Sequence, residues 1–182
     1  IPGGSDDVVS IRKTLAWGSR DELEVVEFYS PSAKKYFMTG RPDEIALLDG
    51  LPSVWQRTGH RFVTHRLDAP LGSAMCRIWA NDGVTLNTHF YSSLDSDCAL
   101  LRGRPWARDE GHVMRSQDFL PQIAIFPPLP PQCPADTVKV IRLFNTATVN
   151  HRYLTEGLLS RMLLSREWQS DGPVFCAGRY ED

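Results

Sequence analysis

Apolar residues in this chain come in short runs, separated by polar turns and by stretches with helical spacing. Runs rich in β-branched and aromatic residues predict strands, and they lie at residues 25–29, 76–79 and 138–144. A second short stretch follows each run and predicts the returning strand of a hairpin. These second stretches lie at residues 36–39, 89–91 and 151–153.

A short helix and a closing strand are expected after each hairpin. Pro42 and the acidic residues after it suit the first turn of a helix, and Gly50 suits its end. The corresponding helices are predicted at residues 94–101 and 156–163.

One stretch, from Thr88 to Ser92, recurs in altered form at residues 35–39 and 150–155. The copies define three repeats, at about 25–65, 75–117 and 138–178, each in the order strand, strand, helix, strand. Repeats that expose an apolar face must bury it on their neighbours. We therefore expect an α+β fold of three repeats closed with pseudo-threefold symmetry, because an open stack would leave both ends uncovered. The alternative is a linear array, capped by residues 1–22 and by a Pro-rich connection at residues 126–134.

The composition predicts a single globular domain over residues 1–182, with residues 1–22 as an extended lead-in. Hydrophobic residues make up 42% and charged residues 23%, which is far from the composition of disordered chains. Because 20 Lys and Arg face 22 Asp and Glu, there is no overall basic field to attract a nucleic acid or an anionic membrane. No apolar run is long enough to span a bilayer. We expect neither partner.

The chain has four cysteines, Cys76, Cys98, Cys133 and Cys176, and their spacing matches none of the paired motifs of zinc sites. An even number at wide spacing favours two disulfides and an oxidising compartment. Buried free thiols are the alternative. The predicted location is secreted or extracellular, with the periplasm included.

Taken together, the repeat motifs resemble a bacterial repeat family of unknown function, found in secreted proteins and often beside extracellular hydrolase domains. The resemblance rests on H-F-Y-T or Y-F-M-T strands, an acidic helix start and W-x-x-x-G before a closing strand, and it covers about residues 25–177. It implies that Cys76 pairs with Cys98 and Cys133 with Cys176. It implies no activity. The chain departs from the pattern at Ser92, in place of Thr, and at Arg152, in place of the central aromatic residue.

Tyr36, His89 and His151 occupy the same place in the three repeats. If the repeats close on an axis, these side chains converge, and they could hydrogen-bond a sugar or ligate a metal. The simpler interpretation is that each anchors its own repeat. Two His and one Tyr are a poor set for zinc, and we predict no metal and no cofactor.

Glu27, Arg77 and Arg142 share a position on the first strands and are candidates for a structural ion-pair network or an anion site. The Trps that precede the closing strands are expected to fill the space between helix and strand, with a sugar-stacking platform as the alternative; they are Trp55, Trp106 and Trp168. Trp17 and Trp79 fall outside that position, so exposed rings are expected there.

Three functions are compatible with these patterns. We favour a noncatalytic extracellular module that binds a glycan or another polymer, of the kind that serves as an accessory domain of a secreted hydrolase. The second is a small secreted hydrolase that uses His89 or His151 with Asp97 or Glu110, although the chain has none of the common nucleophile, zinc-protease or phosphate-loop motifs. The third is a protein-interaction or inhibitor module that uses the Pro-rich segment. The ligand and the oligomeric state are not predicted.

Overall fold

The computed structural model describes residues 20–122, 128–162 and 167–180. Most of the predicted lead-in and residues 126–127 of the Pro-rich connection therefore lie outside the described residues, as does Trp17. The strands are β1 (Glu22–Ser30), β2 (Lys35–Thr39), β3 (Gln56–His65), β4 (Ser73–Asn81), β5 (Asn87–Ser92), β6 (Ala107–Ser116), β7 (Thr137–Asn145), β8 (Asn150–Thr155) and β9 (Trp168–Gly178). The helices are α1 (Pro42–Asp49), α2 (Asp95–Arg102) and α3 (Glu156–Met162).

The predicted α+β class, with three strand-strand-helix-strand repeats closed with pseudo-threefold symmetry, was wrong. In the part of the chain that the structure describes, strands predominate and form one antiparallel sheet of nine strands, with three short helices. The reason is that β3 pairs with β6 at His65 and Arg115, and with β9 at Val63 and Gly178. These short pairings join the closing strands of the three predicted repeats, so that all strands belong to one sheet. The helices have only seven or eight residues each and cover little of the sheet.

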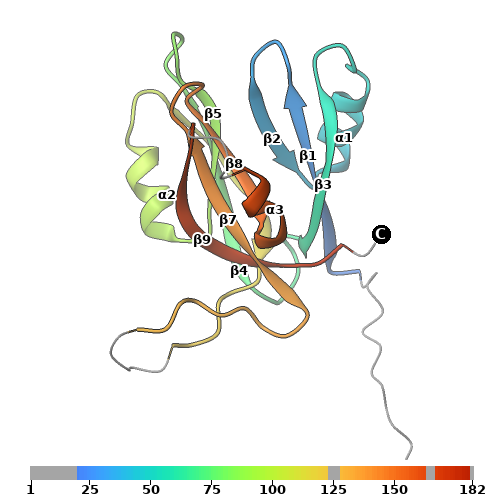
Figure 1. The fold of residues 1–182 in the computed structure, drawn as a ribbon, viewed down its shortest axis with the longest axis vertical. Coiled ribbons are helices and arrows are strands. Elements are labelled where there is room, and N and C mark those ends of the chain that lie inside the picture. The colour runs from blue at the N-terminus through green and yellow to red at the C-terminus, as the bar shows by residue number, and fades with distance from the viewer. Residues whose placement is uncertain (1–19, 123–127, 163–166, 181–182) are drawn as a thin grey trace, which may run out of the picture.

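The sheet contains three hairpins, β1–β2, β4–β5 and β7–β8, whose second strands contact one another pairwise. Figure 1 shows β1, β2, β3 and α1 on one side of the molecule, and the other two hairpins with α2 on the other side. The central core lies where the hairpins meet and takes side chains from all three, among them Met38, Tyr91 and Tyr153. Three smaller apolar clusters lie under the helices. The hairpins therefore share one core.

Two of the three repeated Trps pack on these smaller clusters. Trp55 packs against the cluster of Phe28 and Leu48, and Trp168 packs against the cluster that contains Leu143. Trp106 is also half-buried, and its carbonyl accepts a hydrogen bond from the Asn81 amide. All three Trps are only partly buried, so each leaves some ring surface accessible.

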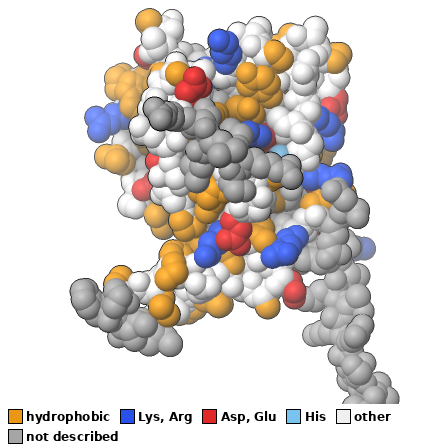
Figure 2. Space-filling model, in the orientation of Figure 1, with side chains coloured by type: hydrophobic (Ala, Val, Ile, Leu, Met, Phe, Trp, Pro, Cys, Tyr) orange, Lys and Arg blue, Asp and Glu red, His pale blue; other side chains and the backbone are white. Residues whose placement is uncertain are grey.

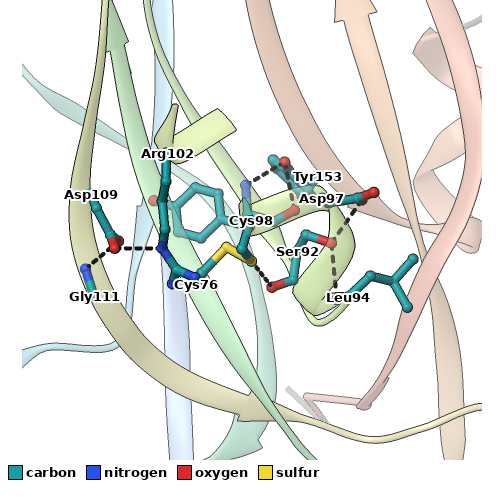
Figure 3. Close-up of a disulfide and its surroundings, with 10 residues drawn as sticks. Cys76, Ser92, Leu94, Asp97, Cys98, Arg102, Asp109, Gly111 and Tyr153 are labelled. Carbon is teal, nitrogen blue, oxygen red and sulfur yellow. Dashed lines mark hydrogen bonds and ion pairs between the residues drawn. A yellow bond between two sulfur atoms is a disulfide. The ribbon is translucent and has the colours of Figure 1, made fainter. Parts of the chain in front are cut away.

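Both cysteine pairs implied by the family resemblance are present as disulfides, which confirms that prediction. Cys76–Cys98 joins β4 to α2 (Figure 3), and the Ser92 carbonyl lies 3.6 Å from the sulfur of Cys98. Cys133–Cys176 ties the long connection between β6 and β7 to β9. Two disulfides indicate that the protein folds in an oxidising environment.

None of the described helices is both long and apolar enough to cross a membrane. On the face shown in Figure 2, basic and acidic side chains are interspersed among hydrophobic ones. This mixture agrees with the near balance of charges in the sequence.

Candidate functional site

The three hairpins bring chemically different residues to matching register positions. Glu27 on β1 lies opposite Met38, Arg77 on β4 opposite Tyr91, and Arg142 on β7 opposite Tyr153. Each of these charged side chains reaches the second strand of a neighbouring hairpin. They form three separate junctions rather than one charge cluster.

Two junctions place a guanidinium over an aromatic ring. Arg77 lies over Phe37 on β2, 5.3 Å from the ring centre, and Arg142 lies over Phe90 on β5 at 4.6 Å. Cation–π contacts of this kind stabilise by about 0.5 to 2 kcal/mol, depending on desolvation. Arg142 also donates to Asp171 at 2.7 Å.

The third junction is an ion pair between Glu27 on β1 and Arg152 on β8. The guanidinium donates to both carboxylate oxygens, at 2.8 and 2.7 Å, and the side chains are only 3% and 11% exposed. Thr58 also donates to Glu27, at 2.7 Å. Arg152 lies 4.0 Å from the ring centre of Tyr36. The chain thus has an acid where the other hairpins have Arg, and an Arg where they have an aromatic residue.

Arg77 is held by two carboxylates that sequence analysis did not single out as its partners. Glu44 at the start of α1 accepts two hydrogen bonds from it, at 2.8 and 2.6 Å, and Glu110 on β6 accepts one at 2.7 Å. Burial raises the pKa of Glu44, but the hydrogen bonds from Arg77 and Thr39 outweigh it and hold the pKa below its ordinary value. Glu44 is therefore ionised at neutral pH and serves as a structural counterion.

Tyr36, His89 and His151, which were expected to converge only if the repeats closed on an axis, border one small hollow. Its volume is about 200 Å³ including the part open to solvent, but the enclosed part has room for only about one water molecule. The remaining lining residues come from the junctions and the central core: Glu27, Phe37, Met38, Tyr91, Arg152 and Tyr153. The convergence is real, but the space admits no sugar ring.

Both histidines are neutral parts of aromatic packing. Burial, and then the nearby Arg77, lower the pKa of His89 to about 3, and burial followed by Arg142 lowers the pKa of His151 to about 4. His89 packs on Phe37 with ring centres 4.6 Å apart, and His151 packs on Phe90 at 5.6 Å.

The strands around the hollow are joined by hydrogen bonds between hairpins. The Tyr91 amide donates to the Tyr153 hydroxyl at 2.8 Å, and the Tyr91 hydroxyl donates to the Met38 carbonyl at 2.5 Å. The His151 amide donates to the Thr88 hydroxyl at 3.0 Å. Backbone and side-chain polar groups that would be costly to bury are thus paired across the centre. Nδ1 of His151 is an exception, being buried without a hydrogen-bond partner among the described residues.

Aromatic cross-strand pairs lie beside the hollow. Tyr29 lies opposite Tyr36 and Trp79 opposite His89 in the strand register, and Phe144 lies opposite His151. The ring centres are 4.6, 6.4 and 5.0 Å apart, respectively. Trp79, expected to be exposed, is half-buried and donates its indole N–H to Asn87 at 2.9 Å.

The described residues contain no group of three or more His, Cys, Asp or Glu placed to hold a metal ion. Of the residues that the hydrolase hypothesis named, His89 and Glu110 do meet, with Nε2 3.5 Å from a carboxylate oxygen. Asp97 instead accepts from Ser92 at 2.9 Å, beside α2 (Figure 3). Arg77 holds Glu110 more closely than His89 does.

The ion pair between Glu27 and Arg152 leads to a prediction about stability. Arg152→Phe or Glu27→Arg alone should cost about 3 to 5 kcal/mol, because each leaves a buried charge without its partner. The double variant should recover part of that loss, since it restores an Arg-over-Phe contact but not the carboxylate partners that Arg77 and Arg142 have. Urea denaturation of the four proteins measures the coupling.

A matched control is the exposed pair of Arg57 and Asp49, whose side chains are 48% and 42% exposed. Removing either partner there should change stability little. The junction assignment is wrong if the double variant at Glu27 and Arg152 is no more stable than the worse single variant.

The lowered pKa values of the two histidines predict that mild acid reduces the stability of the folded protein. The folded-state pKa of each is below the unfolded value of 6.5, so unfolding takes up protons and stability falls as the pH drops from about 6.5 towards 4. The slope should approach about 1.4 kcal/mol per pH unit for each histidine. The pKa of His60 is also lowered by burial and adds in the same direction.

Urea denaturation between pH 7.5 and 5 checks this. The double variant His89→Gln, His151→Gln should show a shallower pH dependence than the parent, whereas His112→Gln, whose side chain is exposed on β6, should not. Equal slopes for parent and double variant would contradict the account of the neutral histidines.

Comparisons of the chain with family models, with curated proteins and with solved structures found no match. The resemblance to a secreted repeat family therefore stays a prediction.

Proposed function

We propose that this protein is a noncatalytic extracellular module that binds a glycan or another polymer. The observation that carries the proposal is the set of aromatic rings beside the hollow, which stay half-exposed on strands locked together by buried contacts. Aromatic rings on rigid elements offer contact area at little cost in conformational entropy. The disulfides support an oxidising location, and placing it outside the cell is part of the proposal.

The ionisable groups at the centre favour a scaffold over a catalyst. Glu27 and Glu44 are both tied to arginines as structural counterions. A general base works best with a pKa near the working pH, and the pKa of His89 is about 3. The hollow beside it admits about one water molecule.

The hydrolase alternative rests on the approach of His89 to Glu110 at 3.5 Å. In a catalytic pair the carboxylate orients the imidazole and stabilises its charged form. Here Arg77 prevents both effects. It pairs with Glu110 at 2.7 Å, and together with burial it disfavours a charged His89. The contact therefore supports packing better than catalysis.

A binding screen tests the proposal. The purified protein is incubated with a set of insoluble polysaccharides, including cellulose, chitin, xylan and a bacterial cell-wall preparation, and the bound fraction is measured after washing. We expect saturable binding to at least one of them, with no release of soluble sugar. A variant at Leu100, which is 64% exposed on α2, serves as a control that should bind like the parent.

A parallel screen with esterase, glycosidase and peptidase substrates addresses the alternative. Turnover that is lost in His89→Gln but kept in the Leu100 variant would replace the binding proposal with the hydrolase. Failure to bind any polysaccharide would also contradict it.

A further inference from the structure

One aromatic pair beside the hollow extends into a row of three rings. Tyr29 at the end of β1 and Tyr36 at the start of β2 lie 4.6 Å apart, with their planes tilted by 37°. Trp168, the first residue of β9, lies 5.9 Å from Tyr36 at a steep angle. All three side chains are half-buried, so each keeps part of its surface accessible. We call Tyr29, Tyr36 and Trp168 the aromatic row.

The polar atoms of the row are unengaged within the part of the chain that the structure describes. The hydroxyls of Tyr29 and Tyr36 and the indole N–H of Trp168 have no hydrogen-bond partner among the described residues. In contrast, Trp79 donates its indole N–H to Asn87, and the buried Tyr91 and Tyr153 use their hydroxyls between hairpins. Buried or half-buried Tyr and Trp usually find a partner for these groups. The row therefore offers donors to an external ligand, whereas Trp79, Tyr91 and Tyr153 do not.

The row is held in place by contacts with β8 and with the turn between β7 and β8. Arg152 lies 4.0 Å from the centre of the Tyr36 ring and is itself fixed by Glu27. Lys35, beside Tyr36, donates to the carbonyls of Thr148 and Val149 in the turn between β7 and β8. The Thr146 amide in the same turn donates to the Glu167 carbonyl at 3.2 Å, and Glu167 directly precedes Trp168. A ligand would thus meet rings that are already positioned.

The two cations next to Tyr36 are engaged within the protein. The guanidinium under Tyr36 is matched by the Glu27 carboxylate at 2.7 Å, and the Lys35 ammonium is directed at two carbonyl oxygens. The chain as a whole carries a formal charge of −2. An anionic polymer would gain little attraction from such a surface, whereas the C–H faces of a neutral pyranose can stack on aromatic rings and its hydroxyls can accept from the unengaged donors.

We infer that the aromatic row is the subsite at which this protein binds neutral pyranose residues of a polysaccharide. The inference rests on the proposed function and deepens it, since it names both the place and the chemical class of the ligand. Tyr29 and Trp168 supply the stacking surface, because one face of Tyr36 is covered by Arg152. Tyr36 is a positioning residue between them.

Affinity electrophoresis through native gels tests the inference. The gels contain a neutral polymer, either hydroxyethyl cellulose or a mixed-linkage β-glucan, or the anionic polymer polygalacturonate. Retardation as a function of polymer concentration gives the affinity. We expect the parent to be retarded by a neutral polymer and not by polygalacturonate.

The variants Tyr29→Ala and Trp168→Phe locate the subsite. Tyr29→Ala should weaken binding to the neutral polymer by about 3- to 10-fold, as expected for the loss of one ring contact. Trp168→Phe keeps a ring in the apolar cluster of β9 but removes the indole N–H, so it should also weaken binding while the protein stays folded. The matched control is Trp106→Phe, at the equivalent position of another repeat and outside both the row and the hollow, and it should bind like the parent. Trp79→Phe probes the aromatic pair of Trp79 and His89 as the other possible place of binding. Circular dichroism melting of each variant confirms that the fold is kept.

The outcomes separate the inference from the proposed function. If a neutral polymer retards Tyr29→Ala and Trp168→Phe as strongly as the parent but no longer retards Trp79→Phe, the inference is overturned. The proposed binding function then still stands. Binding of polygalacturonate alone does the same. Absence of retardation in every polymer, together with no binding in the insoluble screen, overturns both.

Discussion

The buried ion pair between Glu27 and Arg152 is the contact on which the arrangement of the hairpins depends most. Removing two charges from water is costly, and a buried pair repays this only when its geometry is good and its remaining groups are satisfied. Here both carboxylate oxygens are engaged, Thr58 adds a further donor, and the guanidinium rests on Tyr36. The other two junctions use Arg over Phe. Only here does the first strand carry the acid and the neighbouring second strand the Arg. Exchanging hairpins would therefore leave charges unpaired, and we infer that the pair specifies which hairpins meet.

This arrangement explains why the convergent polar residues act as structure. Burial, and then the arginines that join the hairpins, lower the pKa of the two histidines. Arg77 also occupies the carboxylate that a catalytic His89 would need. What remains accessible is aromatic surface next to a rigid centre. Binding sites on strands locked by packing and hydrogen bonds are more precise than sites on loops. The same contacts that close the hollow thus prepare the rings at its border for a ligand.

Much of the local structure was readable from the sequence, because alternation and turn residues mark each hairpin and the Pro, acidic and Gly residues mark α1. The class was misjudged because the strands of separate hairpins join through single residue pairs, such as Val63 with Gly178, which leave no periodic signal. The shared repeat position of His89 and His151 was visible in the sequence, but their convergence was expected only from a threefold closure; in the structure they border one hollow because β5 and β8 contact each other. The partner of Glu27 was missed. The sequence shows both departures from the repeated pattern, an acid at Glu27 on one first strand and Arg152 on one second strand. Two opposite charges that replace the usual residues of the same pattern are a signal that they pair.

The central claim is that the three second strands form one interlocked centre that does not open to expose a catalytic cavity. Native-state amide hydrogen exchange tests it most directly, at the amides of Tyr91 and His151, whose acceptors lie on neighbouring hairpins. The account predicts that both amides exchange only through global unfolding, with an opening free energy equal to that from urea denaturation. Exchange of either amide through a local opening, many-fold faster than global unfolding allows, would contradict the account.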